Sequence, residues 1–146
     1  MRRNRGFTLI ELVLVIAILG ILAVAALPSL FNISLTQAKT NAMNATVASI
    51  QTGLSLLAAN QVAQNQTIAY PASLDTVSTY PGVATGLAPL FGGVLQTPIS
   101  ANWIKKSATC YVYDNDSSGT INAGDIYFQY TTASGTYLQT TSGSCT

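Results

Sequence analysis

A continuous apolar run close to the N-terminus limits what this chain can fold into more than any other feature. The run extends from Phe7 to Leu27, and Glu11 is its only charged residue. As an α-helix these residues would be roughly 32 Å long, which is enough to cross the hydrocarbon core of a bilayer. Three arginines precede the run, and basic residues stay on the cytoplasmic side of a membrane. We therefore expect the residues after the run to be exported, into a compartment where disulfides form.

Three interpretations of the run are open from its residues alone. A secretory signal peptide has a basic, an apolar and a small-residue region, and Ala23-Val24-Ala25 would serve as its cleavage site. A plain membrane anchor would keep the whole segment. The third interpretation starts from Glu11, because an acid inside a membrane segment is costly and indicates a function that requires a partner.

The residues around Glu11 closely resemble the class III prepilin signal of type IV pilins and of type II secretion pseudopilins. The resemblance is carried by the eight residues RGFTLIEL, from Arg5 to Leu12, and by the apolar run that follows. It implies that a prepilin peptidase cuts between Gly6 and Phe7 and methylates the new N-terminal amine of Phe7. It also implies that Glu11 neutralises the N-terminal amine of a neighbouring subunit in a filament.

The same resemblance implies a domain organisation. Residues 1–6 would be the cleaved leader peptide, residues 7–28 the hydrophobic helix of the membrane and filament core, and residues 29–146 a globular head. The head would contain a long loop after the helix and a calcium loop. Gly20 and Pro28 match a glycine and a proline that loosen this helix in many members of the family.

A second helical pattern follows Pro28, where the missing N–H is expected to kink or break a helix. Helix-forming residues resume and continue to about Asn60. Five apolar residues in this stretch are spaced four, three, four and three apart, which places them on one helical face: Met43, Val47, Ile50, Leu54 and Leu57. We expect this stripe to pack against a sheet.

The C-terminal third of the chain has the composition of β-strands. Residues 109–113, 126–131 and 136–140 are rich in Tyr, Val, Ile, Phe and Thr, and Ser134-Gly135 fits a tight hairpin. The prediction is an α+β, pilin-like fold, in which one long N-terminal helix packs on a small antiparallel sheet of three to four strands. Residues 61–108 are expected to form a loop-rich connection, with Trp103 packing in the head and Lys105 and Lys106 in solvent.

Cys110 and Cys145 are the only cysteines of the chain. In an exported protein an even pair is most simply one disulfide, although two free thiols are the alternative. The closed loop would stabilise the head by roughly 3–4 kcal/mol in the chain-entropy model. Such a bridge resembles the pilin disulfide that encloses a C-terminal region often used in adhesion.

Between the first two predicted strands, the residues from Asp114 to Asp125 have the spacing of an EF-hand loop. The loop has oxygen ligands in the register that calcium requires, together with a turn glycine, Gly119: Asp114, Asp116, Ser118, Thr120 through its carbonyl, Asn122 and Asp125. The loop resembles those of dockerin modules and of calcium-stabilised major pseudopilins. The alternative is a solvated hairpin turn, because these residue types also form turns.

Composition argues against an enzyme. The chain has no histidine, so it lacks a Ser-His-Asp or Cys-His arrangement and an imidazole acid or base. Its five acids are Glu11, Asp75 and the three aspartates of the loop, which leaves no separate carboxylate pair. Charged residues make up 8% and the net charge is +1, so no basic surface for nucleic acid is evident.

The leading hypothesis is a structural subunit, inserted in the inner membrane as a prepilin, that polymerises with copies of itself into an extracellular pilus for adhesion or motility. The first alternative is a pseudopilin, which forms a short periplasmic piston for protein secretion or a DNA-uptake filament. A membrane-tethered calcium-binding interaction module is a further alternative. By resemblance, the partners are a prepilin peptidase, a platform protein and an assembly ATPase.

Overall fold

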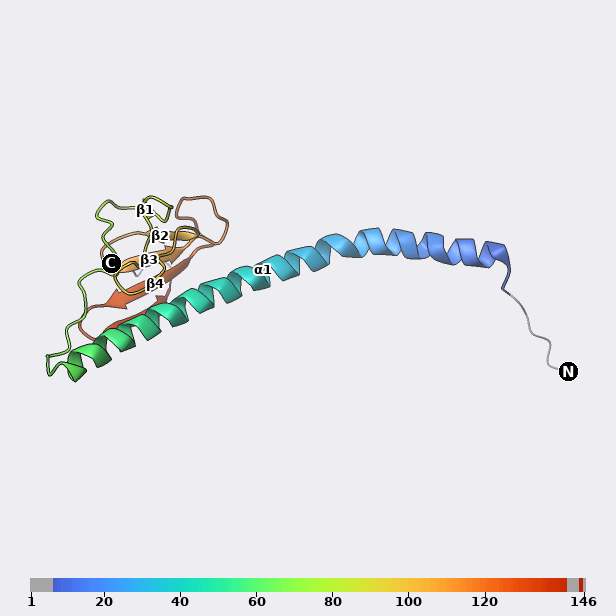
Figure 1. Ribbon diagram of the computed structural model, residues 1–146. Coiled ribbons are helices and arrows are strands. Elements are labelled where there is room, and N and C mark those ends of the chain that lie inside the picture. The colour runs from blue at the N-terminus through green and yellow to red at the C-terminus, as the bar shows by residue number, and fades with distance from the viewer. Residues whose placement is uncertain (1–6, 142–144, 146) are drawn as a thin grey trace. The chain divides into compact units, whose positions relative to one another are not determined.

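The computed structural model describes residues 7–141 and Cys145, with the side chains of 27–34 left out. The chain divides into two compact units, Met1–Asn41 and Ala42–Thr146. One helix, α1 (Leu9–Ala63), extends through both units, and the strands all lie in the second unit (Figure 1). The strands are β1 (Gly82–Val83), β2 (Trp103–Lys105), β3 (Cys110–Tyr113), β4 (Ile126–Thr131) and β5 (Thr136–Thr140).

Helix α1 is 55 residues long and continues without a break through Gly20 and Pro28. The predicted single long helix is therefore confirmed, and of the two effects expected at Pro28, a kink or a break, the break does not occur. A proline removes a single N–H from the hydrogen-bond ladder, and the helix-forming residues on both sides keep the remaining bonds. The helix ends three residues after the predicted end, where Asn65 adopts a left-handed conformation with φ of 54°.

The sheet contains five antiparallel strands in the order β1-β2-β3-β4-β5. Strands β3, β4 and β5 coincide with the three predicted strands to within one residue. The predicted count of three to four strands is too low, because β1 and β2 are two and three residues long and lie in the stretch predicted as loop. Runs this short show no alternation in sequence. The predicted hairpin at Ser134-Gly135 is confirmed, and Gly135 has a positive φ of 65°.

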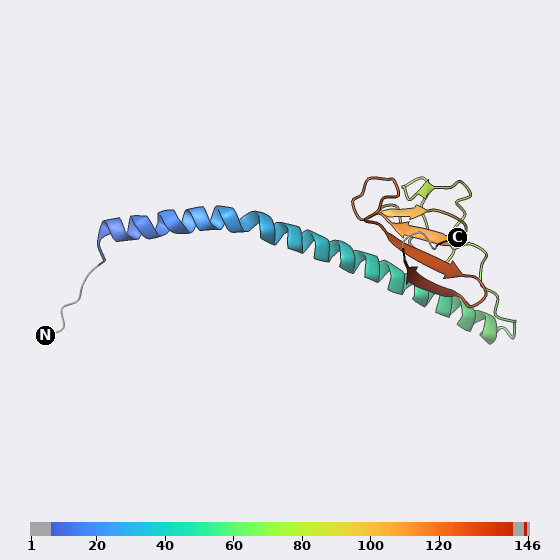
Figure 2. The ribbon, with the colours of Figure 1, turned by 180° about the vertical axis from the view of Figure 1, so that it is seen from behind.

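One face of the sheet packs against the second half of α1 and forms the main core (Figure 1, Figure 2). Met43, Ile50 and Leu54 of the predicted stripe are buried in this core and Val47 packs against it, whereas Leu57 is only half-buried. The sheet and its loops contribute an aromatic layer whose rings contact one another; Phe128 and Tyr137, for example, stack with centroids 5.4 Å apart. The layer consists of Phe91, Trp103, Tyr111, Tyr113, Phe128 and Tyr137, and Tyr130 lies in the same core.

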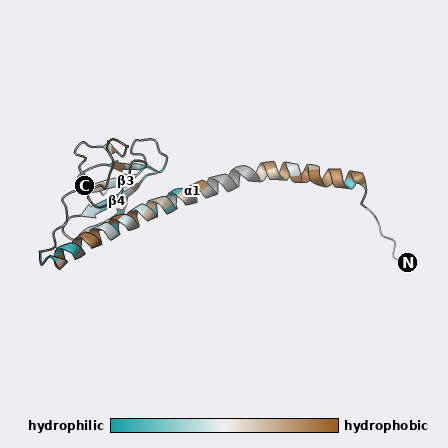
Figure 3. Ribbon diagram, viewed as in Figure 1, coloured by the Kyte–Doolittle hydropathy of each residue, from teal (hydrophilic) through white to brown (hydrophobic). Residues whose placement is uncertain are grey.

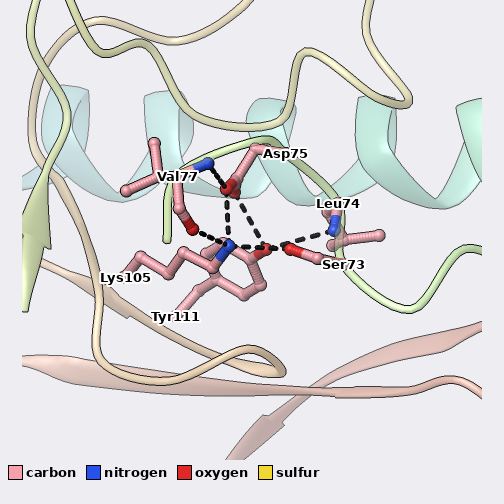
Figure 4. A network of polar contacts seen from close by, with 6 residues as sticks. All are labelled: Ser73, Leu74, Asp75, Val77, Lys105 and Tyr111. Carbon is pink, nitrogen blue, oxygen red and sulfur yellow. Dashed lines mark hydrogen bonds and ion pairs between the residues drawn. The ribbon is translucent and has the colours of Figure 1, made fainter. Parts of the chain in front are cut away.

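A buried ion pair fastens the loop after α1 to the sheet (Figure 4). Lys105 Nζ lies 2.6 Å from Asp75 Oδ1, and both side chains are 1% exposed. Nζ also donates to Ser73 Oγ and to the Val77 carbonyl, each at 2.7 Å. These three acceptors match the three protons of an ammonium group. The prediction that Lys105 lies in solvent is therefore wrong: its charge is inside the head and compensated there.

Tyr111 completes this network from the middle of the sheet. Its hydroxyl donates to Asp75 Oδ2 at 2.9 Å and accepts a bond from the Leu74 amide at 3.3 Å. Burial, more than any other cause, raises the pKa of Tyr111 well above its usual value. The hydroxyl therefore keeps its proton and remains a donor to Asp75 over the physiological range of pH.

The second face of the sheet has a smaller core that includes a disulfide. Cys110 on β3 is bonded to Cys145 near the C-terminus, with the two Cα atoms 5.5 Å apart, so the predicted bridge is confirmed. Both cysteines are buried with Ile104, Val112 and Tyr127, and Ile121 packs against this cluster from the loop between β3 and β4.

The ion pair yields a stability prediction. Replacing Asp75 with Asn leaves the Lys105 ammonium buried without a countercharge, so the free energy of unfolding should fall by about 3–5 kcal/mol. The measurement is denaturant unfolding of the full chain in detergent, followed by tryptophan fluorescence of Trp103.

The control adds Lys105→Met to Asp75→Asn, which removes both charges and keeps an acceptor for the Tyr111 hydroxyl. This double variant should be more stable than the single Asp75→Asn variant. Equal or lower stability of the double variant would show that the charge of Lys105 is not what the Asp75 carboxylate compensates.

Candidate functional site

The first candidate site is the N-terminal part of α1. Residues Leu9–Ala26 have a mean hydropathy of 2.9, and none of this segment is buried inside the structure. Figure 3 shows the segment as almost uniformly hydrophobic around the helix. By length and composition it is able to cross a membrane. A helix that is apolar all round requires an apolar environment, either lipid or other protein.

Glu11 lies at the beginning of this helix and is bonded to Thr8. Its Oε2 accepts hydrogen bonds from the Thr8 amide at 2.9 Å and from the Thr8 hydroxyl at 2.8 Å. The Thr8 hydroxyl in turn lies 3.4 Å from the Glu11 amide. This reciprocal arrangement is a capping box, which satisfies N–H groups that the first helical turn leaves without partners.

The carboxylate of Glu11 therefore has a partner in its own chain, which the sequence analysis missed. The Thr-x-x-Glu spacing at the start of the helix is the signal that indicates it. Phe7 is 85% exposed and lies directly before the cap. Gly6, and with it the predicted cleavage bond, lies outside the described residues. The predicted contact of Glu11 with a neighbouring subunit stays a prediction.

The second candidate site is the loop between β3 and β4, where three aspartates come together. One carboxylate oxygen from each of Asp114, Asp116 and Asp125 lies within 4.8 Å of the others. Asp114 and Asp125 are buried, at 3% and 7% exposure, while Asp116 is exposed. The pKa of the neighbouring Tyr113 is raised, chiefly by burial and secondly by the negative charge of Asp114.

Backbone amides of the loop fold around these carboxylates. Asp114 accepts bonds from the amides of Ser118 at 3.1 Å and Gly119 at 2.7 Å, which requires the tight turn that Gly119 makes with φ of 73°. Asp125 accepts bonds from the amides of Asn115 at 3.0 Å and Asn122 at 2.7 Å. These amides are neutral, so they do not cancel the negative charges that the aspartates bring together.

The remaining predicted ligands lie in the same loop and bond to one another. Asn122 Nδ2 donates to Asp116 Oδ2 at 3.0 Å and to Ser118 Oγ at 2.8 Å. Ser118 Oγ donates to the Thr120 carbonyl at 3.1 Å. The Ser118 side chain is the largest of the causes that lower the pKa of Asp116 and favour its charged form. The loop thus presents carboxylate, hydroxyl and carbonyl oxygens, the hard donors that calcium prefers.

The donor set therefore fits a divalent cation, and the cluster of Asp114, Asp116 and Asp125 could hold one. When bound, calcium would supply the positive charge that the three carboxylates lack. Sequence reasoning missed one residue here, Ile121, which lies between two predicted ligands and packs against the second core. The signal for it is a lone apolar side chain inside an otherwise polar loop.

Comparison with known proteins concerns the N-terminal site alone. Residues 1–27 match the family described as the prokaryotic N-terminal methylation motif. This motif, the class III prepilin signal, is typical of type IV pilins and pseudopilins. No curated protein and no solved structure matches the chain.

The acidic loop yields a prediction on metal removal. If calcium binds the folded head, a free concentration of about 100 times the dissociation constant stabilises it by about 2.7 kcal/mol. The melting temperature of the full chain should therefore rise on adding calcium and fall on adding a chelator, as scanning calorimetry in detergent would show. Asp125→Ala and Asp114→Ala should remove this response.

The matched control for that response is Asp75→Asn, which destabilises the head at a place outside the loop. Its melting temperature should be low in both buffers and still rise with calcium. A wild-type chain that melts at the same temperature in calcium and in chelator would contradict the calcium prediction.

Proposed function

We propose that this protein is the structural subunit of a type IV pilus-like filament. It would enter the inner membrane as a prepilin, be cut between Gly6 and Phe7, be methylated at Phe7, and then polymerise through its apolar helix. The observation that carries the proposal is the combination of the matched methylation motif with a fully exposed apolar segment, Leu9–Ala26, on a helix that continues into a folded head.

Because Leu9–Ala26 is exposed and apolar, we infer that the protein assembles by burying this segment among the same segments of other copies. In the membrane, lipid covers the helix, and in a filament the helices of neighbouring subunits would replace lipid. Between apolar helices in a bilayer the driving force comes from packing and from polar contacts rather than from exclusion of water. One polar group on such a helix therefore sets the register of its neighbour, and Glu11 is the only charged residue from Phe7 to Leu27.

The chemistry of Glu11 fits this role. Cleavage after Gly6 would create an amine at Phe7, and methylation of an amine keeps its positive charge. An amine of one subunit and a carboxylate of the next would each otherwise be a costly isolated charge in apolar surroundings. Both bonds from Thr8 go to Oε2 of Glu11. The capping box thus holds the carboxylate at the end of the helix, and its other oxygen, which accepts no hydrogen bond from the described residues, would bind an amine.

A major pseudopilin of a type II secretion system, or of a DNA-uptake pseudopilus, is the second candidate. The observation that favours it is the acidic loop between β3 and β4, which resembles the calcium-stabilised loops of major pseudopilins. The disulfide resembles pilins instead. Calcium in this loop would have a structural role in either protein, by holding the β3–β4 connection.

The proposal is tested by shearing intact cells and measuring the mass of any copy of the protein that is released. Shearing should release the protein, and its non-reduced mass should start at N-methyl-Phe7 and be two hydrogens light for the disulfide. A processed chain that shearing does not release would favour the pseudopilus. A chain that starts after Ala25 would contradict the filament proposal and indicate a secretory signal peptide.

The role of Glu11 yields a prediction with a matched pair of variants. Glutamine also completes a capping box, so Glu11→Gln keeps the helix start and removes the charge, whereas Glu11→Ala removes both. We expect both variants to be exported, processed and folded, and both to lose filaments in electron micrographs of sheared material. Normal filaments from Glu11→Gln would show that the cap, and not the charge, is what assembly requires.

A further inference from the structure

The second face of the sheet is covered by a small core to which segments from outside the sheet contribute. Its strands contribute Ile104, Cys110, Val112 and Tyr127 to a small core. Within the described part of the chain, two segments from outside the sheet join this core: Cys145 from the C-terminal tail and Ile121 from the acidic loop. Cys145 and Ile121 therefore belong to the same small core, although only Cys145 is covalently linked to β3.

The position of Ile121 depends on the order of the acidic loop, because both of its neighbours are bonded to that loop. Asn122 donates from its amide to Asp125 and from its side chain to Asp116. The Thr120 carbonyl accepts a bond from Ser118. A change in the spacing of the carboxylates therefore moves the two residues between which Ile121 is held.

The carboxylates have a reason to move apart when no cation is bound. Three like charges whose oxygens lie within 4.8 Å repel one another, and two of them are buried where solvent screens them least. A divalent cation would reverse this repulsion and draw the loop together. Ile121 would then be held more firmly against the second core, which also contains the buried Cys110 and Cys145.

We propose that Ile121 couples the acidic loop to the buried Cys110–Cys145 bridge, so that calcium in the loop protects this bridge from reduction. The proposal rests on the calcium site proposed above and adds a consequence for a different part of the molecule. Reduction requires a thiolate to reach a sulfur that the folded head buries, so its rate reports how often the second core opens.

Coupling between two sites is reciprocal for binding free energies. If calcium stabilises Cys145 in the second core, the intact bridge must raise the calcium affinity of the loop by the same factor. A chain with both cysteines replaced by serine is expected to bind calcium more weakly. The resistance of the Cys110–Cys145 bridge to reduction would then depend on the calcium concentration of the surrounding medium.

The experiment measures disulfide reduction in the full chain in detergent. Dithiothreitol is added in calcium or in chelator, and the free thiols are counted by mass after alkylation. Calcium binding to the same samples is measured by titration calorimetry. We expect calcium to slow reduction of the wild-type bridge about fivefold or more, the lower range of typical coupling. In Ile121→Ala, reduction should be fast and nearly the same in both buffers.

Leu138→Ala is the matched control, because Leu138 is an apolar residue of β5 that is 59% exposed and lies outside both cores. It should keep the full protection by calcium. Calcium binding with equal reduction rates in the wild type would overturn the coupling and leave the calcium site standing. Full protection in Ile121→Ala would overturn Ile121 as the link. A calorimetric titration without heat, together with an unchanged melting temperature, would overturn both the site and the coupling.

Discussion

A single helix in two environments is the constraint on which the rest of this structure depends. From Leu9 to Ala26 the helix is apolar on every side and exposed, so it requires lipid or other helices around it. From Met43 to Leu54 it has one apolar face, and the sheet covers that face. Residues Leu9–Ala26 contribute no side chain to the cores of the head, so their apolar surface is available to lipid or to other helices.

The main elements could be predicted because their signals are local. The apolar run, the stripe from Met43 to Leu54 and the three longest strands each occupy one continuous stretch with its own period. The Cys110–Cys145 bridge followed from cysteine number and compartment. What sequence reasoning did not find was set by distant residues: Lys105 looked like half of a solvated lysine pair, and its partner Asp75 is thirty positions away. Strands β1 and β2 are defined by pairing to neighbours, not by their own composition.

The candidate sites divide in the same way. The cluster from Asp114 to Asp125 could be predicted because its residues lie in twelve consecutive positions, and the structure brings its three carboxylates together, while calcium itself stays a prediction. The Thr8–Glu11 cap was equally local, but its spacing was attributed to the cleavage motif alone. The packing of Ile121 had only a weak signal, a lone apolar side chain in a polar loop, because the residues it packs against, such as Ile104, Val112 and Tyr127, lie in other segments.

The chain has few charged residues, and each of its five acids lies at a specific place in the structure. Glu11 caps the apolar helix, Asp75 compensates a buried lysine, and the remaining three aspartates converge in one loop. All five acids are thus tied to specific partners or to one another. A surface with few charges of its own repels identical copies weakly, because net charge is what keeps proteins apart in solution. In such a chain the few charged side chains have a large effect on which contacts between copies are favourable. In the proposed filament Glu11 would select how neighbouring helices align, whereas Asp75 acts inside the head, where it is buried with Lys105.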